Sequence, residues 1–276
     1  MLESRRAAVL GHPIAHSLSP TLHRAAYEAL RLPWHYDAID LDAAGFAPFL
    51  ASLDSSWAGL SLTMPLKVEA VPHMDFIEPM AKLVGAINTV LIQPFGDQRH
   101  LVGANTDVHG VVAALREAGL ESARTGLVIG GGATATSAMA ALGELGVTAP
   151  VIAVRDRARA GALLRAATKM GVSVHFADIS QAGLLAAQAD VVVSTIPADA
   201  GARVGEQVTT ASGMLLDVVY SPPVTPLGAA WEAAGGTRVG GERMLLHQAG
   251  EQVRLMTGRV APIDEMNAAL RAVLNT

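Results

Sequence analysis

The stretch LVIGGGATATSAMAALGELG, residues 127–146, places a short apolar run, three glycines and an alanine-rich helical segment in direct succession. Glycines let the backbone turn tightly and approach a pyrophosphate, and the following helix start offers free N–H groups and a positive dipole end. A second apolar run begins at Val151, about 20 residues after the glycines, as a βαβ unit requires. The stretch therefore predicts a dinucleotide-binding unit, with a plain turn of the chain as the alternative.

The segment AVRDRARAG, residues 153–161, includes the end of that second run and bears on the choice of dinucleotide. An acidic side chain at this point accepts a hydrogen bond from a ribose 2′-hydroxyl, whereas an arginine pairs with a 2′-phosphate. The segment supplies Asp156 together with Arg155, Arg157 and Arg159. These residues leave both NADP and NAD open, and the alternative for Asp156 is the N-cap of an exposed helix.

Apolar runs of strand length alternate with helical patterns along the whole chain, which favours βαβ units. Helices are expected at 19–30, with Ser19 as N-cap and Pro20 in the first position, at 106–118, and twice after residue 241. The expected strands are 7–10, 35–39, 58–62, 88–92, 101–102, 127–129, 151–154, 172–175, 191–193 and 214–217. We interpret this pattern as two α/β domains joined near residue 106, the second with parallel strands covered on both faces.

The composition and charge of the chain exclude several kinds of site and partner. The 276 residues contain no cysteine, which excludes disulfides and thiolate metal sites, and the net charge of −5 gives no electrostatic reason to expect a nucleic acid or a membrane as partner. The apolar runs are too short to cross a bilayer, and the N-terminal stretch does not resemble a signal peptide. We therefore expect a soluble, cytoplasmic protein, monomeric or homodimeric, that acts on a small molecule.

The segment GHPIAHSLSP, residues 11–20, contains two candidate chemistries. His12 and His16 could bind a metal ion, and Ser17 and Ser19 could donate hydrogen bonds to a ligand. Pro13 spoils the helical spacing of the two histidines, and no further ligand gathers nearby. We therefore expect no metal site.

Six segments, in order, resemble the shikimate dehydrogenase family over nearly the whole chain: GHPIAHSLSPTLH (11–23), GLSLTMPLK (59–67), GAINTV (85–90), GANTDVHG (103–110), DVVYSPPVTPL (217–227) and GGERMLLHQA (240–249). The resemblance implies reversible reduction of 3-dehydroshikimate to shikimate with NADP, a step of aromatic amino-acid (chorismate) biosynthesis. It also implies a substrate domain formed by 1–106 with 242–276, and a Rossmann-like, doubly wound dinucleotide-binding domain at 107–241.

Carried over residue by residue, the resemblance makes Lys67 and Asp107 the catalytic pair. It assigns substrate contacts to Ser17, Ser19, Thr63, Asn88, Tyr220 and Gln248, and cofactor contacts to Gly130, Gly131, Gly132, Ala133, Arg155, Asp156, Arg159, Thr195, Val218 and Gly241. Ser17 and Ser19 would bind the substrate carboxylate. If their segment is extended, both hydroxyls point the same way and Leu18 packs behind them.

The chain departs from the family pattern at a few positions. Ser61 replaces an asparagine, a change we expect to be tolerated because a hydroxyl still forms hydrogen bonds. Thr136 replaces an arginine that commonly faces the cofactor, and Val154 and Asp156 replace the asparagine and threonine of an N-R-T block. NADP stays the first choice because Arg155 and Arg159 are retained, and NAD is the alternative.

Two other functions remain as alternatives. One is a quinate dehydrogenase, or a dual quinate/shikimate enzyme, that uses NAD. The other is a non-catalytic sensor that binds dinucleotide or shikimate, since a fold alone does not prove activity. Retention of both Lys67 and Asp107 argues against the sensor, because a pure binder needs no proton donor.

Overall fold

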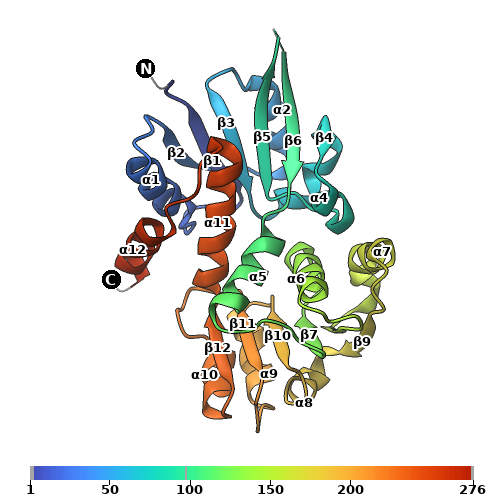
Figure 1. Ribbon diagram of the computed structural model, residues 1–276. Helices are drawn as coiled ribbons and strands as arrows, with labels where there is room; N and C mark the ends of the chain where they lie inside the picture. Colours follow the sequence, from blue (N-terminus) through green and yellow to red (C-terminus); the bar gives the residue numbers. More distant parts are fainter. Residues whose placement is uncertain (1–2, 97, 275–276) are drawn as a thin grey trace. The chain divides into compact units, whose positions relative to one another are not determined.

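The computed structural model describes residues 3–96 and 98–274, with every side chain in these ranges except that of Arg159. The chain divides into two compact units, Met1–Thr106 with Leu246–Thr276 and Asp107–Leu245. Each unit contains its own six-stranded sheet (Figure 1). The mixed α/β fold class is confirmed.

The sheet of the first unit has the strand order β2-β1-β3-β5-β6-β4. Strand β1 pairs in parallel with β2 and β3, whereas β5 runs antiparallel to β3 and β6, and β4 pairs in parallel with β6 at the edge. The strands are β1 (Arg6–Gly11), β2 (His35–Asp40), β3 (Trp57–Leu62), β4 (Phe76–Ile77), β5 (Thr89–Phe95) and β6 (Gln98–Ala104). The hairpin of β5 and β6 is longer than the sequence suggested, because its pairing continues to Phe95 and Gln98.

Helices cover this sheet, and β3 is therefore buried along its whole length. Leu60 and Leu62 pack into an apolar cluster with Phe46 of α2. Gly59 faces helix α11 instead, where an added Cβ would lie 2.9 Å from Met256, so the glycine lets this helix approach the strand closely. The helices are α1 (Ser19–Ala29), α2 (Ala43–Ser52), α3 (Leu66–Glu69), α4 (Pro79–Val84) and α12 (Ile263–Leu274), with the later part of α11 (Gly241–Thr257).

The sheet of the second unit is parallel throughout, in the order β12-β11-β10-β7-β8-β9. Its first strand lies in the middle and the chain winds outward in both directions, which is the doubly wound order of dinucleotide-binding domains. The strands are β7 (Gly126–Ile129), β8 (Val151–Val154), β9 (His175–Asp178), β10 (Val191–Ser194), β11 (Met214–Asp217) and β12 (Thr237–Gly240). The helices are α5 (Asp107–Glu117), α6 (Ala133–Glu144), α7 (Gly161–Met170), α8 (Ala182–Ala186), α9 (Ala198–Gly205) and α10 (Pro226–Ala233).

Two sequence predictions of element position were wrong. The strand expected at 172–175 is β9 at 175–178, because the N–H of Val172 is used to close the end of α7 on Ala167 O at 2.9 Å. Strand β12 was not predicted. Helix α1 has Leu18 as its N-cap, so Ser19 is its first residue rather than its cap.

Candidate active site

The loop that leads into α1 turns rather than extends. Leu18 has φ −90° and ψ 1°, and the Ser19 N–H donates to Ser17 Oγ at 3.3 Å. The expectation of an extended segment with two parallel hydroxyls was therefore wrong, because a local turn at the helix start competes with the extended form. Ser19 is buried at the first position of α1, and Ser17 is half-buried.

A buried histidine fixes the start of α1. His23 is one helical turn after Ser19, and its Nδ1 lies 3.0 Å from the Ser19 carbonyl oxygen. Because a carbonyl only accepts, this nitrogen carries the proton. Burial lowers the pKa of His23 to about 4, against a raising effect of that backbone hydrogen bond. The ring stacks on Tyr36 with centroids 4.0 Å apart. We did not predict a role for His23, although its spacing of four residues from Ser19 on a helix is the signal for such a contact.

Thr63 and Lys67 follow β3, Thr63 on a turn and Lys67 on the short helix α3. The Thr63 N–H donates to Leu10 O at 2.9 Å, and its carbonyl oxygen accepts from Leu66 N at 2.8 Å, which starts α3. Lys67 is on this short helix, half-buried, and its carbonyl oxygen accepts from Ile87 N at 2.7 Å. The backbone of Lys67 is thereby held beside the segment that leads to Asn88.

Asn88 is the centre of a buried cluster. Its Nδ2 donates to Thr106 Oγ1 at 2.9 Å and to Gln248 Oε1 at 3.3 Å, and its Oδ1 accepts from Thr106 N at 2.8 Å. The structure thus brings together Asn88 and Gln248, two of the predicted substrate residues. Thr106 is the last residue of the first unit before Asp107.

Asp107 begins α5 and is 3 % exposed. A carboxylate in the first turn also stabilises the helix dipole. Lys67 belongs to the first unit and Asp107 to the second, so their pairing stays a prediction. Tyr220 also belongs to the second unit, in the loop after β11, and burial raises its pKa.

The glycine loop lies at the carboxyl end of β7, between β8 and β10 in the sheet. Gly130 has φ 123°, a conformation that side chains rarely adopt, and an added Cβ would collide with Thr195 Oγ1. That hydroxyl donates to Ile129 O at 3.0 Å. Helix α6 begins at Ala133, and its N-cap Gly132 offers no side-chain hydrogen bond. Such a loop can hold a dinucleotide pyrophosphate against the helix start.

The arginine-rich segment that follows β8 is shaped by Asp156. Its carboxylate accepts from Ala158 N at 2.9 Å and caps the turn at Arg157–Ala160, so the predicted capping alternative is present. The Arg157 guanidinium lies 4.9 Å from the centre of the Phe176 ring. Arg155 is exposed. The Arg159 side chain lies outside the part of the chain that the structure describes.

Val218 and Gly241 follow β11 and β12 at the same carboxyl edge of the sheet. Val218 N–H donates to Ser194 O at 3.0 Å, and an added Cβ on Gly241 would collide with the Val218 carbonyl oxygen. Asp217, which we did not predict, accepts a hydrogen bond from Thr225 Oγ1 at 2.6 Å. Burial raises its pKa, while the Thr225 hydrogen bond opposes that shift. These contacts stabilise the loop that carries Tyr220.

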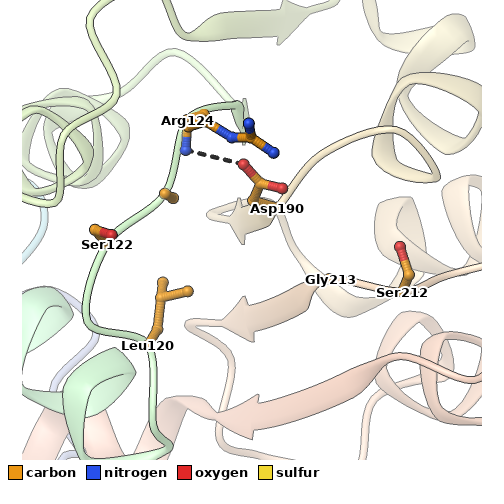
Figure 2. A pocket seen from close by; sticks show the side chains of 7 residues that line it. Leu120, Ser122, Arg124, Asp190, Ser212 and Gly213 are labelled. Carbon is orange, nitrogen blue, oxygen red and sulfur yellow. Dashed lines mark hydrogen bonds between the residues drawn. The ribbon is translucent and has the colours of Figure 1, made fainter.

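A hollow with a volume of about 410 Å³ lies at the opposite edge of this sheet (Figure 2). It is lined by Leu120, Ser122, Ala123, Arg124, Asp190, Ser212 and Gly213, which precede β7, β10 and β11. The Asp190 carboxylate accepts from the N–H groups of Arg124 and Thr125 at 2.9 Å each, and these bonds lower its pKa. Ligands of doubly wound sheets bind at the carboxyl edge. We therefore assign these contacts to joining β7 and β10.

Among the described residues, no group of three His, Asp or Glu side chains is arranged to hold a metal ion. The His12 ring lies 2.5 Å from Asp40 Oδ1, a contact that raises the pKa of His12. None of the helices in the described ranges is long and apolar enough to span a membrane.

The doubly wound sheet with a glycine loop at its switch point, together with a second α/β unit carrying a buried polar cluster, defines a class: the two-domain, dinucleotide-dependent oxidoreductases. Residues 9–90 match the family model of the shikimate dehydrogenase substrate binding domain, and residues 241–271 match that of the shikimate 5′-dehydrogenase C-terminal domain. The chain belongs to the shikimate dehydrogenase family.

Individual relatives agree with this assignment. Shikimate dehydrogenase (NADP⁺) of Citrifermentans bemidjiense is 35 % identical over 99 % of this chain and 97 % of its own length. The structure of Mycobacterium tuberculosis shikimate dehydrogenase superposes with a TM-score of 0.88 at 40 % identity, covering 98 % of this chain and 99 % of that one. The structure of a Thermus thermophilus shikimate 5-dehydrogenase in complex with NADP(H) and shikimate superposes with a TM-score of 0.81 at 31 % identity. The match covers 99 % of this chain and 100 % of that one. The predicted family is confirmed.

Proposed function

We propose that this enzyme reduces 3-dehydroshikimate reversibly to shikimate with NADP, the first unit binding the substrate and the second the dinucleotide. The observation that carries the proposal is the buried cluster in which Asn88 bonds both Gln248 and Thr106, the residue before Asp107. A polyhydroxy carboxylate needs amide, hydroxyl and charged partners of this kind. Membership of the shikimate dehydrogenase family supports the choice of substrate.

Reduction of a ring ketone needs a hydride at carbon and a proton at oxygen. The nicotinamide, when bound, supplies the hydride. Lys67 donates the proton to the ketone oxygen during reduction and accepts it during oxidation, since a half-buried ammonium is a suitable acid. Asp107 orients Lys67 and accepts a hydrogen bond from the neighbouring ring hydroxyl. Asn88 and Gln248 bind the ring hydroxyls, and Ser17, Ser19 and Thr63 bind the remainder of the substrate.

We propose NADP as the preferred dinucleotide. Arg155 is exposed directly after β8, where it can pair with the adenosine 2′-phosphate. The Asp156 carboxylate, which would repel that phosphate, is hydrogen-bonded to Ala158 N. The relative from Thermus thermophilus was found with NADP(H), which supports the same choice.

Initial rates of oxidation of shikimate and of quinate, each with NADP and with NAD, test the proposal most directly. We expect the highest kcat/KM for shikimate with NADP. A steep preference for quinate with NAD would instead identify the enzyme as a quinate dehydrogenase. Binding of both ligands without any oxidation would identify a non-catalytic sensor.

Arg155→Ala is expected to raise the KM for NADP by about tenfold, because a charged hydrogen bond to phosphate contributes roughly 1.5–3 kcal/mol and this side chain is solvent-screened. The KM for NAD should change little. Arg165→Ala is the matched control, since Arg165 is an exposed arginine further along α7. Equal effects on NADP and NAD would remove Arg155 from the 2′-phosphate site.

A further inference from the structure

A continuous chain of buried hydrogen bonds crosses the first unit and ends at the candidate substrate residues. It joins strands β2, β3 and β5 to helix α11, although its members are far apart in the sequence. The chain runs through Tyr36, Ser61, Gln252, Thr89, Asn88 and Gln248. Of these, only Asn88 and Gln248 were predicted as site residues.

The first half of this chain reaches Gln252 from the sheet. Tyr36 Oη donates to Ser61 Oγ at 2.6 Å, and Ser61 Oγ donates to Gln252 Oε1 at 2.8 Å. Burial raises the pKa of Tyr36 well above its ordinary value, while the side-chain hydrogen bonds to Ser61 and Ser19 lower it. Gln252 is 1 % exposed, so its polar atoms depend on these protein partners.

The second half leads from Gln252 to the substrate residues. Gln252 Nε2 donates to the Asn88 carbonyl oxygen at 3.0 Å and to Thr89 Oγ1 at 2.9 Å. Because Asn88 Oδ1 only accepts, the Thr89 O–H donates to it at 2.9 Å. Asn88 Nδ2 then donates to Gln248 Oε1 at 3.3 Å.

Two backbone groups fix the direction of the whole chain. The Asn88 carbonyl only accepts, so the Gln252 atom facing it must be the amide nitrogen. The Thr106 N–H only donates, so the Asn88 atom facing it must be the amide oxygen. A flip of either amide would place like groups against each other. The Gln248 oxygen therefore faces Asn88, and its amide nitrogen is turned away from it.

We propose that Gln252 is a positioning residue for the substrate site: its amide is a second donor to the Asn88 carbonyl, beside the Leu62 N–H, and holds the Thr89 hydroxyl against Asn88 Oδ1, so that Asn88 and Gln248 meet the substrate in one fixed orientation. Gly59 makes this possible, because α11 approaches β3 closely over the missing side chain. This inference rests on the proposed function, in which Asn88 and Gln248 bind ring hydroxyls.

Two variants of the full-length enzyme test the role of Gln252. Gln252→Met keeps the length of the side chain and removes all its hydrogen bonds. Gln252→Glu keeps the shape but, when ionised, turns an acceptor toward the Asn88 carbonyl. Gln181→Met, at an exposed position in the second unit, is the control. The kinetics are measured for shikimate and NADP across a range of pH, together with the thermal midpoint of each protein.

We expect Gln252→Met to raise the KM for shikimate by about tenfold and to leave the KM for NADP within about twofold, since one well-placed hydrogen-bond partner corresponds to roughly a factor of ten. For Gln252→Glu, protonation restores a donor, so kcat/KM for shikimate should rise as the pH falls, in contrast to the wild type. If Gln252 served only to stabilise the fold, its replacement would lower the thermal midpoint but would change the KM for shikimate and the KM for NADP to the same extent.

The inference would be overturned if neither Gln252→Met nor Gln252→Glu changed the KM for shikimate. It would also be overturned if the KM for shikimate and the KM for NADP rose by the same factor. If Gln252→Met does not fold, the pH dependence of Gln252→Glu decides. A wild-type enzyme that does not oxidise shikimate overturns the proposed function instead. The Asn88 side-chain amide resonance in NMR spectra then decides the inference alone: Gln252→Met must shift it and Gln181→Met must not, and an unshifted resonance overturns it.

Discussion

Lys67→Ala is expected to lower the turnover of shikimate by roughly 100- to 10,000-fold, the range of general acid–base catalysis, with little change in the KM for shikimate. The reason is that Lys67 supplies the proton that the reacting oxygen gains or loses, whereas Asn88, Gln248 and the serines supply the binding. Steady-state kinetics of shikimate oxidation with NADP measure both quantities.

Lys67→Arg separates charge from proton transfer in the same experiment. Arginine keeps the positive charge but does not give up its proton in proteins, so turnover should stay low. Lys82→Ala is the control, because Lys82 is an exposed lysine of the same unit, near the end of α4. Near-normal turnover of Lys67→Ala would remove Lys67 from the chemistry and leave it as an ordinary lysine at a helix start.

The free energy of unfolding is expected to fall by about 3 kcal/mol between pH 6.5 and pH 4 on account of His23 alone. Its pKa is about 4 in the folded state, against an ordinary value of 6.5. Between these values the unfolded chain binds a proton that the folded chain does not, so stability rises with pH across this window. The contribution is complete above pH 6.5 and is lost as the pH falls to about 4.

Urea unfolding of the wild type and of His23→Gln at several pH values measures this effect. The variant loses the titrating group, so its stability should depend less steeply on pH in the window, whatever its absolute stability. Hydrogen bonds lower the pKa values of carboxylates such as Asp40 and Asp54. These groups contribute equally to the pH dependence of both proteins, so their effect cancels in the comparison. His35→Gln, at an exposed histidine, should keep the wild-type slope. Equal slopes for the wild type and His23→Gln would contradict the buried neutral histidine.

The second sheet could be predicted from the sequence because most of its strands are continuous apolar runs. VIAV, VVVS and MLLD are each buried or nearly so, as parallel strands between helices require. Strand β12 escaped prediction because TRVG at 237–240 carries one large apolar residue among polar and small ones. Its position is set by pairing with β11, a contact that no local pattern reveals.

The candidate site likewise contains one part that the local sequence predicts and another that it does not. The glycine loop could be identified locally, since the strand, turn and helix are consecutive. Lys67, Asn88 and Gln248 were identified only through a resemblance to known motifs. The hydrogen bond between Asn88 and Gln252 joins residues 164 positions apart, and spacing along the chain does not predict such contacts. At Ser17 the sequence missed a local contact instead, since its hydroxyl accepts a hydrogen bond from the Ser19 N–H.

The close approach of α11 over Gly59 also has a consequence for the order in which the protein can assemble. The amide that satisfies the Asn88 carbonyl and Thr89 comes from Gln252, which is synthesised after the entire second unit. A fragment limited to residues 1–106 would lack this amide, although the Asn88 carbonyl would keep the Leu62 N–H and the Thr89 hydroxyl would keep Asn88 Oδ1. Domains generally fold in the order of synthesis. Here the dinucleotide-binding unit is complete first, and the substrate-binding unit becomes complete only when the chain returns to it.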